Sequence, residues 1–162
     1  MSFFIEDLVI TKDDDLDLNL KEIKLDACLE VINQKFKTKK SEDTSLTICL
    51  RFVTRQNMKR LNLIYSGKNK ETNVLSFEPV LQKLDGNENC LGDIAICTDI
   101  LKGEAKDQNK DFLDHLVHLF VHGVLHLFGY SHDSEHEASN MELIEKEVLK
   151  KLSIDDPYQI EL

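Results

Sequence analysis

The sequence has 162 residues, of which 41% are apolar, and its formal net charge at neutral pH is −10. This length corresponds to one ordinary domain, and the apolar content argues against intrinsic disorder. The acidity argues against a protein that coats DNA or RNA by bulk positive charge, and no apolar run reaches the roughly 18 residues that span a bilayer.

The charges are unevenly distributed along the chain. The segment from Lys35 to Lys70 has ten basic and two acidic residues, a local charge of +8, whereas the rest, with ten basic and 28 acidic residues, carries −18. The basic segment could attract an RNA backbone, or its first lysines could simply stabilise the C-terminal end of a helix. The acidic run Asp13 to Asp15, followed by Asp17, is expected to lie in a solvated loop.

Apolar periodicity predicts the elements in chain order. We expect a strand over 1–10, a helix over 20–36, a strand over 46–53, a helix over 54–65, strands over 74–77 and 93–97, and helices over 98–108, 111–128 and 134 to about 152. In the helix over 54–65, Met58, Leu61 and either Ile64 or Tyr65 should face the core. The segment 79–89 is expected to be a polar loop.

This order of elements predicts one α+β domain over 1–162, with a small mixed sheet packed with helices and a buried, histidine-bearing helix near the C-terminus. An S-x-x-E capping box at Ser134 and Glu137 should begin the last helix. The cysteines form no C-x-x-C pair, so we expect reduced cysteines in a cytoplasmic protein.

All six histidines fall between His115 and His136. Four of them share one stripe of the helix over 111–128, namely His115, His118, His122 and His126. The apolar residues expected to pack into the core lie on the other side of this helix: Leu113, Phe120, Val121, Val124, Leu127 and Phe128.

The spacing of three histidines predicts a metal site. His122 and His126 are four residues apart, which lets two imidazoles reach one ion. His132 can join them only if the chain turns back, and Gly129 permits that turn. Three histidines leave a fourth position open for water, as in catalytic zinc sites. A shifted site that uses His118 with His122 is the alternative.

The other histidines are expected to be core residues satisfied by hydrogen bonds, because one tetrahedral site cannot use them all. They are His115, His118 and His136.

The three-histidine spacing equals that of the metzincin proteases, with one difference. The residue after the first histidine is Glu in those enzymes, where it acts as the general base, and it is Gly123 here. A metallopeptidase mechanism of that type therefore lacks its base.

The segment from His122 to His132 reads HGVLHLFGYSH. It resembles the H-G-x-L-H-L-x-G-Y-D-H signature of the YbeY family of bacterial metal-dependent endoribonucleases. Further similarity to the family lies at 61–62, at 65–77 (YSGKNKETNVLSF), at 91–94 and at 156–158.

The resemblance implies a compact α+β fold and a metal-dependent hydrolase with one ion at His122, His126 and His132. Zn²⁺ is expected, and Ni²⁺ or another divalent transition metal also suits three imidazoles. The resemblance further implies cleavage of single-stranded RNA in the 3′-end maturation of small-subunit (16S) ribosomal RNA and in ribosome quality control. The partners would be ribosomal RNA and the small ribosomal subunit, with neither a membrane nor DNA.

Two positions depart from the family pattern. Ser66 stands where the family has an arginine that is its candidate for gripping phosphate, and Ser131 stands where the family has an aspartate. Lys68 and Lys70 could hold phosphate as point charges instead. Ser66 and Arg55 are further candidate substrate-binding residues, although Arg55 could equally be structural.

These departures keep two alternatives open. One is a metal-binding ribosome-assembly factor with weak or absent catalysis, and the other is a metallopeptidase-type hydrolase.

Overall fold

Four strands form one mixed sheet in the computed structural model, which describes residues 4–36, 45–78 and 90–159. The strands are β1 (Phe4–Lys12), β2 (Ser45–Val53), β3 (Val74–Phe77) and β4 (Cys90–Cys97), in the order β1-β2-β4-β3. The pairs β1–β2 and β2–β4 are parallel, whereas β3 runs antiparallel to β4 at one edge.

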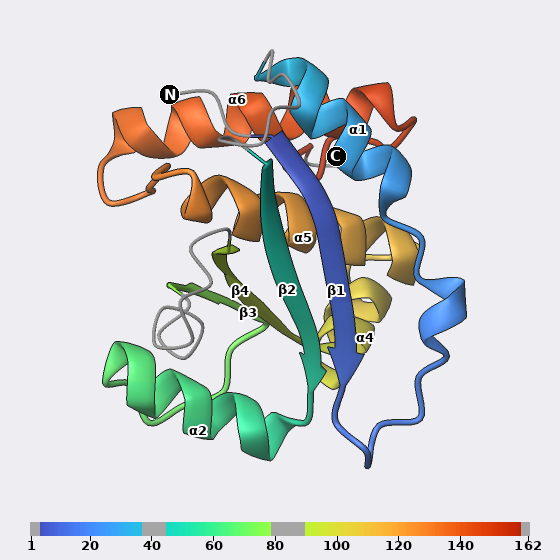
Figure 1. Ribbon diagram of the computed structural model, residues 1–162, viewed down its shortest axis with the longest axis vertical. Coiled ribbons are helices and arrows are strands. Elements are labelled where there is room, and N and C mark those ends of the chain that lie inside the picture. Colours follow the sequence, from blue (N-terminus) through green and yellow to red (C-terminus); the bar gives the residue numbers. More distant parts are fainter. Residues whose placement is uncertain (1–3, 37–44, 79–89, 160–162) are drawn as a thin grey trace.

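Helices cover both faces of this sheet (Figure 1). The helices are α1 (Asp26–Lys35), α2 (Arg55–Ser66), α4 (Thr98–Asp107), α5 (Phe112–Leu127) and α6 (Glu135–Lys151). The larger core cluster lies between the sheet and α1, α5 and α6, and a smaller one lies under α2. The predicted α+β fold with a mixed sheet and a histidine-bearing helix is confirmed.

Two predicted elements differ in their bounds. The expected helix over 20–36 is a 3₁₀ turn, Leu20–Glu22, followed by α1, because Ile23 adopts an extended conformation between them. Strand β4 begins at Cys90 rather than at residue 93, because its pairing with β2 already starts there. The predicted loop over 79–89 lies outside the described residues.

The prediction of a solvated acidic loop is wrong for Asp13. This residue is 6% exposed, and its carboxylate accepts hydrogen bonds from Arg51 Nε (3.0 Å), Thr54 N (2.9 Å) and Asn57 Nδ2 (2.7 Å). Burial alone would raise the pKa of Asp13, but these hydrogen bonds and the Arg51 charge lower it. Asp13 therefore joins the end of β1 to the start of α2, while Asp14, Asp15 and Asp17 are exposed as predicted.

Two predictions of core residues are wrong. Ile64 and Tyr65, the alternatives for one inward position of α2, are 64% and 43% exposed, and Leu113 is 44% exposed. In α2 the buried face consists of Met58 and Asn62, and the Asn62 amide donates to the Lys70 carbonyl (2.9 Å). The buried polar residue Asn62 thus takes the inward position that periodicity assigned to an apolar side chain.

No disulfide joins the four cysteines, all of which lie in the described residues, as predicted. Across residues 4–36, 45–78 and 90–159, no helix has the length and apolar character needed to cross a bilayer.

Candidate metal centre

Helix α5 carries the candidate site across one face of the sheet. The Asp111 side chain caps its first turn by accepting from Asp114 N (3.1 Å). Phe120, Val121 and Val124 are fully buried, which fixes the rotation of the helix and leaves the histidine stripe to find polar partners.

The end of α5 returns the chain toward the histidines. Gly129 has φ +97°, in the left-handed region that favours glycine. Its N–H donates to His126 O (3.0 Å), and Tyr130 N donates to Leu125 O (3.0 Å), which together form a Schellman motif. This turn places His132, three residues after Gly129, beside the C-terminal end of α5.

The side chains of His122, His126 and His132 converge. Their candidate ligand atoms all lie within 4.8 Å of one another, so this group could hold a metal ion. The His132 ring centroid is 5.7 Å from that of His122 and 5.0 Å from that of His126. His132 is exposed and the other two are partly buried, so the group opens to solvent on one side.

Hydrogen bonds at Nδ1 leave the Nε2 atoms of two histidines available. His126 Nδ1 lies 3.0 Å from the Tyr130 carbonyl oxygen, which can only accept, so Nδ1 carries the proton. His122 Nδ1 donates in the same way to Glu145 Oε1 (2.5 Å). Burial and the neighbouring His122 lower the pKa of His126, which favours the neutral ring.

The two Nε2 atoms lie 3.0 Å apart. In the neutral rings both present lone pairs to each other, an arrangement that a cation between them would stabilise. The donor set therefore fits a divalent transition metal.

Glu145 of α6 holds the histidine stripe in place. It is fully buried and accepts hydrogen bonds from His122, from His118 Nε2 (3.2 Å) and from the Tyr158 hydroxyl. Burial alone would raise the pKa of Glu145, but these three donors hold it at about 2. Because donors engage both oxygens, Glu145 orients His122 rather than acting as a base.

Sequence reasoning missed Glu145 and the role of Tyr158. A signal for Glu145 was present, since this carboxylate occurs between Met141 and Val148 on the apolar stripe of α6. A lone acid on a buried stripe needs buried donors.

The remaining histidines divide into two kinds. His115 and His118 are buried, as predicted, and their Nε2 atoms are engaged by Glu104 (3.1 Å) and by Glu145. The prediction is wrong for His136, which is exposed in the first turn of α6.

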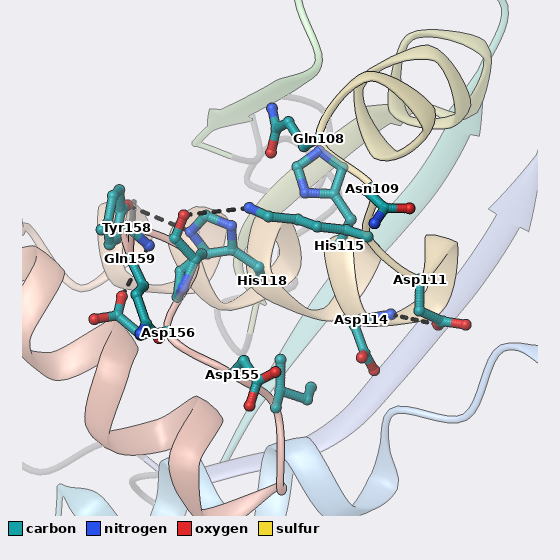
Figure 2. Close-up of a pocket in the computed structure, with 13 residues that line it drawn as sticks. Gln108, Asn109, Asp111, Asp114, His115, His118, Asp155, Asp156, Tyr158 and Gln159 are labelled. Atoms are coloured by element: carbon teal, nitrogen blue, oxygen red, sulfur yellow. Dashed lines mark hydrogen bonds between the residues drawn. The ribbon is translucent and has the colours of Figure 1, made fainter. Parts of the chain in front are cut away.

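A cavity of about 460 Å³ adjoins the first half of α5. Figure 2 shows His115 and His118 at this cavity, with Tyr158 beside His118. The three convergent histidines do not line it, so the cavity is separate from the candidate metal centre.

Gly123 allows α5 to lie close to the sheet. A Cβ atom there would come within 3.0 Å of Ser76 Oγ and 3.1 Å of two Ile94 side-chain atoms. The Ser76 hydroxyl also donates to the Gly123 carbonyl (3.0 Å). A glutamate of the metzincin kind would be crowded at this position by the side chains of Ser76 in β3 and Ile94 in β4.

Comparison with known proteins identifies the family of the chain. The sequence profile of the family described as Endoribonuclease YbeY matches residues 10–153. The chain belongs to the YbeY family.

Similar proteins include the Endoribonuclease YbeY of Bartonella henselae, which is 46% identical over 118 residues, covering 72% of this chain and 75% of the relative. The Endoribonuclease YbeY of Vesicomyosocius okutanii is 36% identical over 151 residues, covering 93% of this chain and 100% of the relative. The solution structure of TM1509 from Thermotoga maritima matches with a TM-score of 0.53 at 22% identity, covering 94% of this chain and 99% of the other, and shows a shared fold.

The two departures from the YbeY pattern have defined surroundings. Ser131 Oγ accepts from the backbone N–H of Asp133 (3.1 Å), so it closes a local turn from Ser131 to Asp133, with His132 between them. Ser66 is the last residue of α2 and is exposed. Neither serine can supply the charge of the family residue it replaces.

The predicted substrate-binding residues lie along α2 and the segment after it. Arg55 is in the first turn of α2, where it forms an ion pair with Glu71 (3.0 Å). Ser66, Lys68 and Lys70 lie at the other end of α2 and beyond it, all exposed. Because the Lys70 carbonyl accepts from Asn62 and Glu71 reaches Arg55, the segment after α2 runs back along the helix, and only Ser66 and Lys68 stay at its C-terminal end.

Proposed function

We propose that this chain is a single-strand-specific, metal-dependent endoribonuclease. Membership of the YbeY family supports RNA cleavage. One observation supports the metal dependence above all others. The Nε2 atoms of His122 and His126 lie 3.0 Å apart, with both Nδ1 atoms engaged elsewhere and His132 beside them.

We assign different roles to the histidines, the lysines and the groups that orient the histidine rings. His122, His126 and His132 would hold Zn²⁺, with Ni²⁺ or a similar ion as the other candidates. When bound, such an ion lowers the pKa of a water molecule and offsets negative charge on phosphoryl oxygens. Lys68 and Lys70 would attract the RNA backbone as exposed positive charges, and the Tyr130 carbonyl and Glu145 keep the histidine rings in their orientation.

In the cell we propose that the substrate is the 3′ end of small-subunit (16S) ribosomal RNA, in the cytoplasm, with a further role in ribosome quality control. Family resemblance supports this assignment. A precursor RNA that carries the natural 3′ extension tests it, because the purified protein should shorten that extension and leave a duplex of equal length intact.

The central experiment compares two histidine substitutions. Wild-type protein of known metal content is incubated with single-stranded RNA, duplex RNA and casein. His126→Ala should abolish both single-strand cleavage and stoichiometric metal binding. His136→Ala, which removes an exposed histidine outside the group, should change neither. Cleavage that persists in a folded His126→Ala variant refutes the proposal.

The casein arm tests the peptidase alternative. Gly123 supplies no metzincin-type base, and Ser76 and Ile94 crowd any side chain at that position, so casein should remain intact. Peptide-bond cleavage that depends on His126 would favour the alternative.

A second candidate function is a ribosome-assembly factor that binds metal and RNA without cleaving. Ser66 and Ser131 favour it, because they remove two charged groups of the family pattern. The Ser66→Arg substitution separates the two cases, since it should accelerate cleavage if the active site lacks only a phosphate-binding charge. If wild type and Ser66→Arg both bind metal stoichiometrically and RNA tightly, and neither cleaves RNA, the result would support the assembly factor.

A further inference from the structure

An exposed aromatic stack lies at the C-terminal end of α2. The rings of Tyr65 and Phe77 are parallel within 13°, with centroids 4.3 Å apart. Phe77 covers one face of the Tyr65 ring, yet Tyr65 remains 43% exposed. Its neighbours Leu63 and Ile64 are 47% and 64% exposed. An exposed group of large apolar side chains is typical of a binding surface.

The stack is separated from the candidate metal centre by one edge strand. Phe77 follows Ser76 in β3, so their side chains point to opposite faces of the sheet. Phe77 packs on the α2 side, whereas Ser76 bonds to the Gly123 carbonyl, next to His122. In Figure 1 the C-terminal ends of α2 and α5 lie on the same side of the molecule, to the left.

Helix α2 and the residues just after it are positively charged, and the nearest acidic residues in the sequence, Glu71 and Glu78, follow Lys70 and Phe77. Residues 54–70 contain no aspartate or glutamate. Lys59, Arg60, Lys68 and Lys70 are exposed, and within the described part of the chain none of them forms an ion pair. Exposed aromatic rings among unpaired cations are typical of single-stranded nucleic-acid binding, in which bases stack on the rings and cations follow the phosphates.

We propose that Tyr65 is a base-stacking residue, whose exposed ring face holds one unpaired base of the RNA. The RNA backbone would pass the cations of α2 and reach the histidines around the β3 edge. This inference rests on the proposed function, because it takes RNA as the substrate. It also supplies a physical reason for single-strand specificity, since a base within a duplex has both faces covered by its neighbours.

A tryptophan at position 65 gives a direct test. The chain contains no tryptophan, so Tyr65→Trp introduces a single fluorophore that keeps an aromatic face on Phe77. We expect single-stranded RNA to quench this fluorescence and duplex RNA of the same sequence to leave it nearly unchanged. Ile64→Trp is the matched control, one residue away and outside the stack, and should respond weakly to both.

Binding measurements complete the test. Tyr65→Leu should weaken single-stranded RNA binding by about 5- to 150-fold, the range found when a stacked aromatic is removed, and Tyr65→Phe should bind like wild type. Thermal unfolding of each variant checks that the fold is retained. Equal quenching by the two RNAs, equal quenching at positions 64 and 65, or no quenching at all overturns the inference.

These outcomes are distinguishable from failure of the proposed function. A wild-type protein that cleaves no RNA refutes the endoribonuclease, yet selective quenching at position 65 would still support base stacking. Single-strand cleavage by wild type, with unchanged binding in Tyr65→Leu, refutes base stacking and leaves the endoribonuclease intact.

Discussion

Glu145→Gln tests whether a buried carboxylate sets the geometry of the metal centre. The substitution preserves side-chain volume but replaces one acceptor oxygen with an NH₂ group, which can only donate. Three donors converge on Glu145, from His122, His118 and Tyr158. The donors bond to both carboxylate oxygens, and the single amide oxygen can replace only one of them. At least one donor therefore loses its partner, or one histidine changes tautomer.

The expected magnitude follows from these hydrogen bonds. Loss of an outer hydrogen-bond partner of a metal ligand typically costs about 10- to 100-fold in metal affinity. A hydrogen bond to a charged group contributes about 1.5–3 kcal/mol to stability. We therefore expect Glu145→Gln to weaken Zn²⁺ binding by about 10- to 100-fold and to lower the free energy of unfolding by about 1–3 kcal/mol.

Competition with a chromophoric chelator measures the affinity, and urea unfolding of the metal-free protein measures the stability. Glu142→Gln is the matched control, since it removes the same charge from α6 at a partly buried site without a contact to the histidines. A folded Glu145→Gln variant with wild-type affinity would show that Glu145 does not position His122. An equal loss of Zn²⁺ affinity in Glu145→Gln and Glu142→Gln would show that the change in net charge causes the loss.

Three further predictions concern packing and charge. Asp13→Asn should lower stability at pH 7 and less so at pH 3, because a carboxylate whose folded pKa is lowered stabilises above its unfolded value of 3.8 and loses that contribution as pH falls; urea unfolding at both pH values should show the difference shrink. Gly123→Ala should destabilise by about 1–3 kcal/mol through overpacking, whereas Gly103→Ala, with open space around it in α4, should stabilise by up to about 1 kcal/mol; equal effects in urea unfolding would contradict the close approach of α5. Joint substitution of Lys68 and Lys70 by glutamine should flatten the salt dependence of RNA binding, by about 0.7 in the logarithmic slope for each phosphate that the variant no longer neutralises, as fluorescence anisotropy at several salt concentrations can test.

Short-range sequence patterns predicted the elements that depend on contacts between residues close together in the sequence. Apolar spacing and capping residues predicted α5 and α6, because each helix buries one stripe and has a side-chain cap at its start. Alternation predicted β2, and a short apolar run predicted β3. The three convergent histidines could also be anticipated, since Gly129 and the Schellman motif bring His132 back within a few residues.

Long-range polar contacts could not be predicted in this way. The charge pattern placed Asp13 in solvent, but its donors lie 38 to 44 positions away and reach it only once β1 and β2 pair. Periodicity placed either Ile64 or Tyr65 inward, because it cannot show that the buried Asn62 amide tethers the following segment to α2.

The histidine stripe shows how a distant residue resolves an ambiguity that spacing leaves. His118 with His122 and His122 with His126 are both separated by four residues, so either pair could begin a metal site. Glu145 binds His118 through Nε2 and His122 through Nδ1. One carboxylate thereby turns Nε2 of His118 toward the protein and leaves Nε2 of His122 facing His126. A site shifted to His118 would have to displace a buried, ionised partner, whereas the site at His126 uses lone pairs that already face each other. Glu145, 23 positions after His122, therefore favours His122 with His126 as the pair that begins the proposed site.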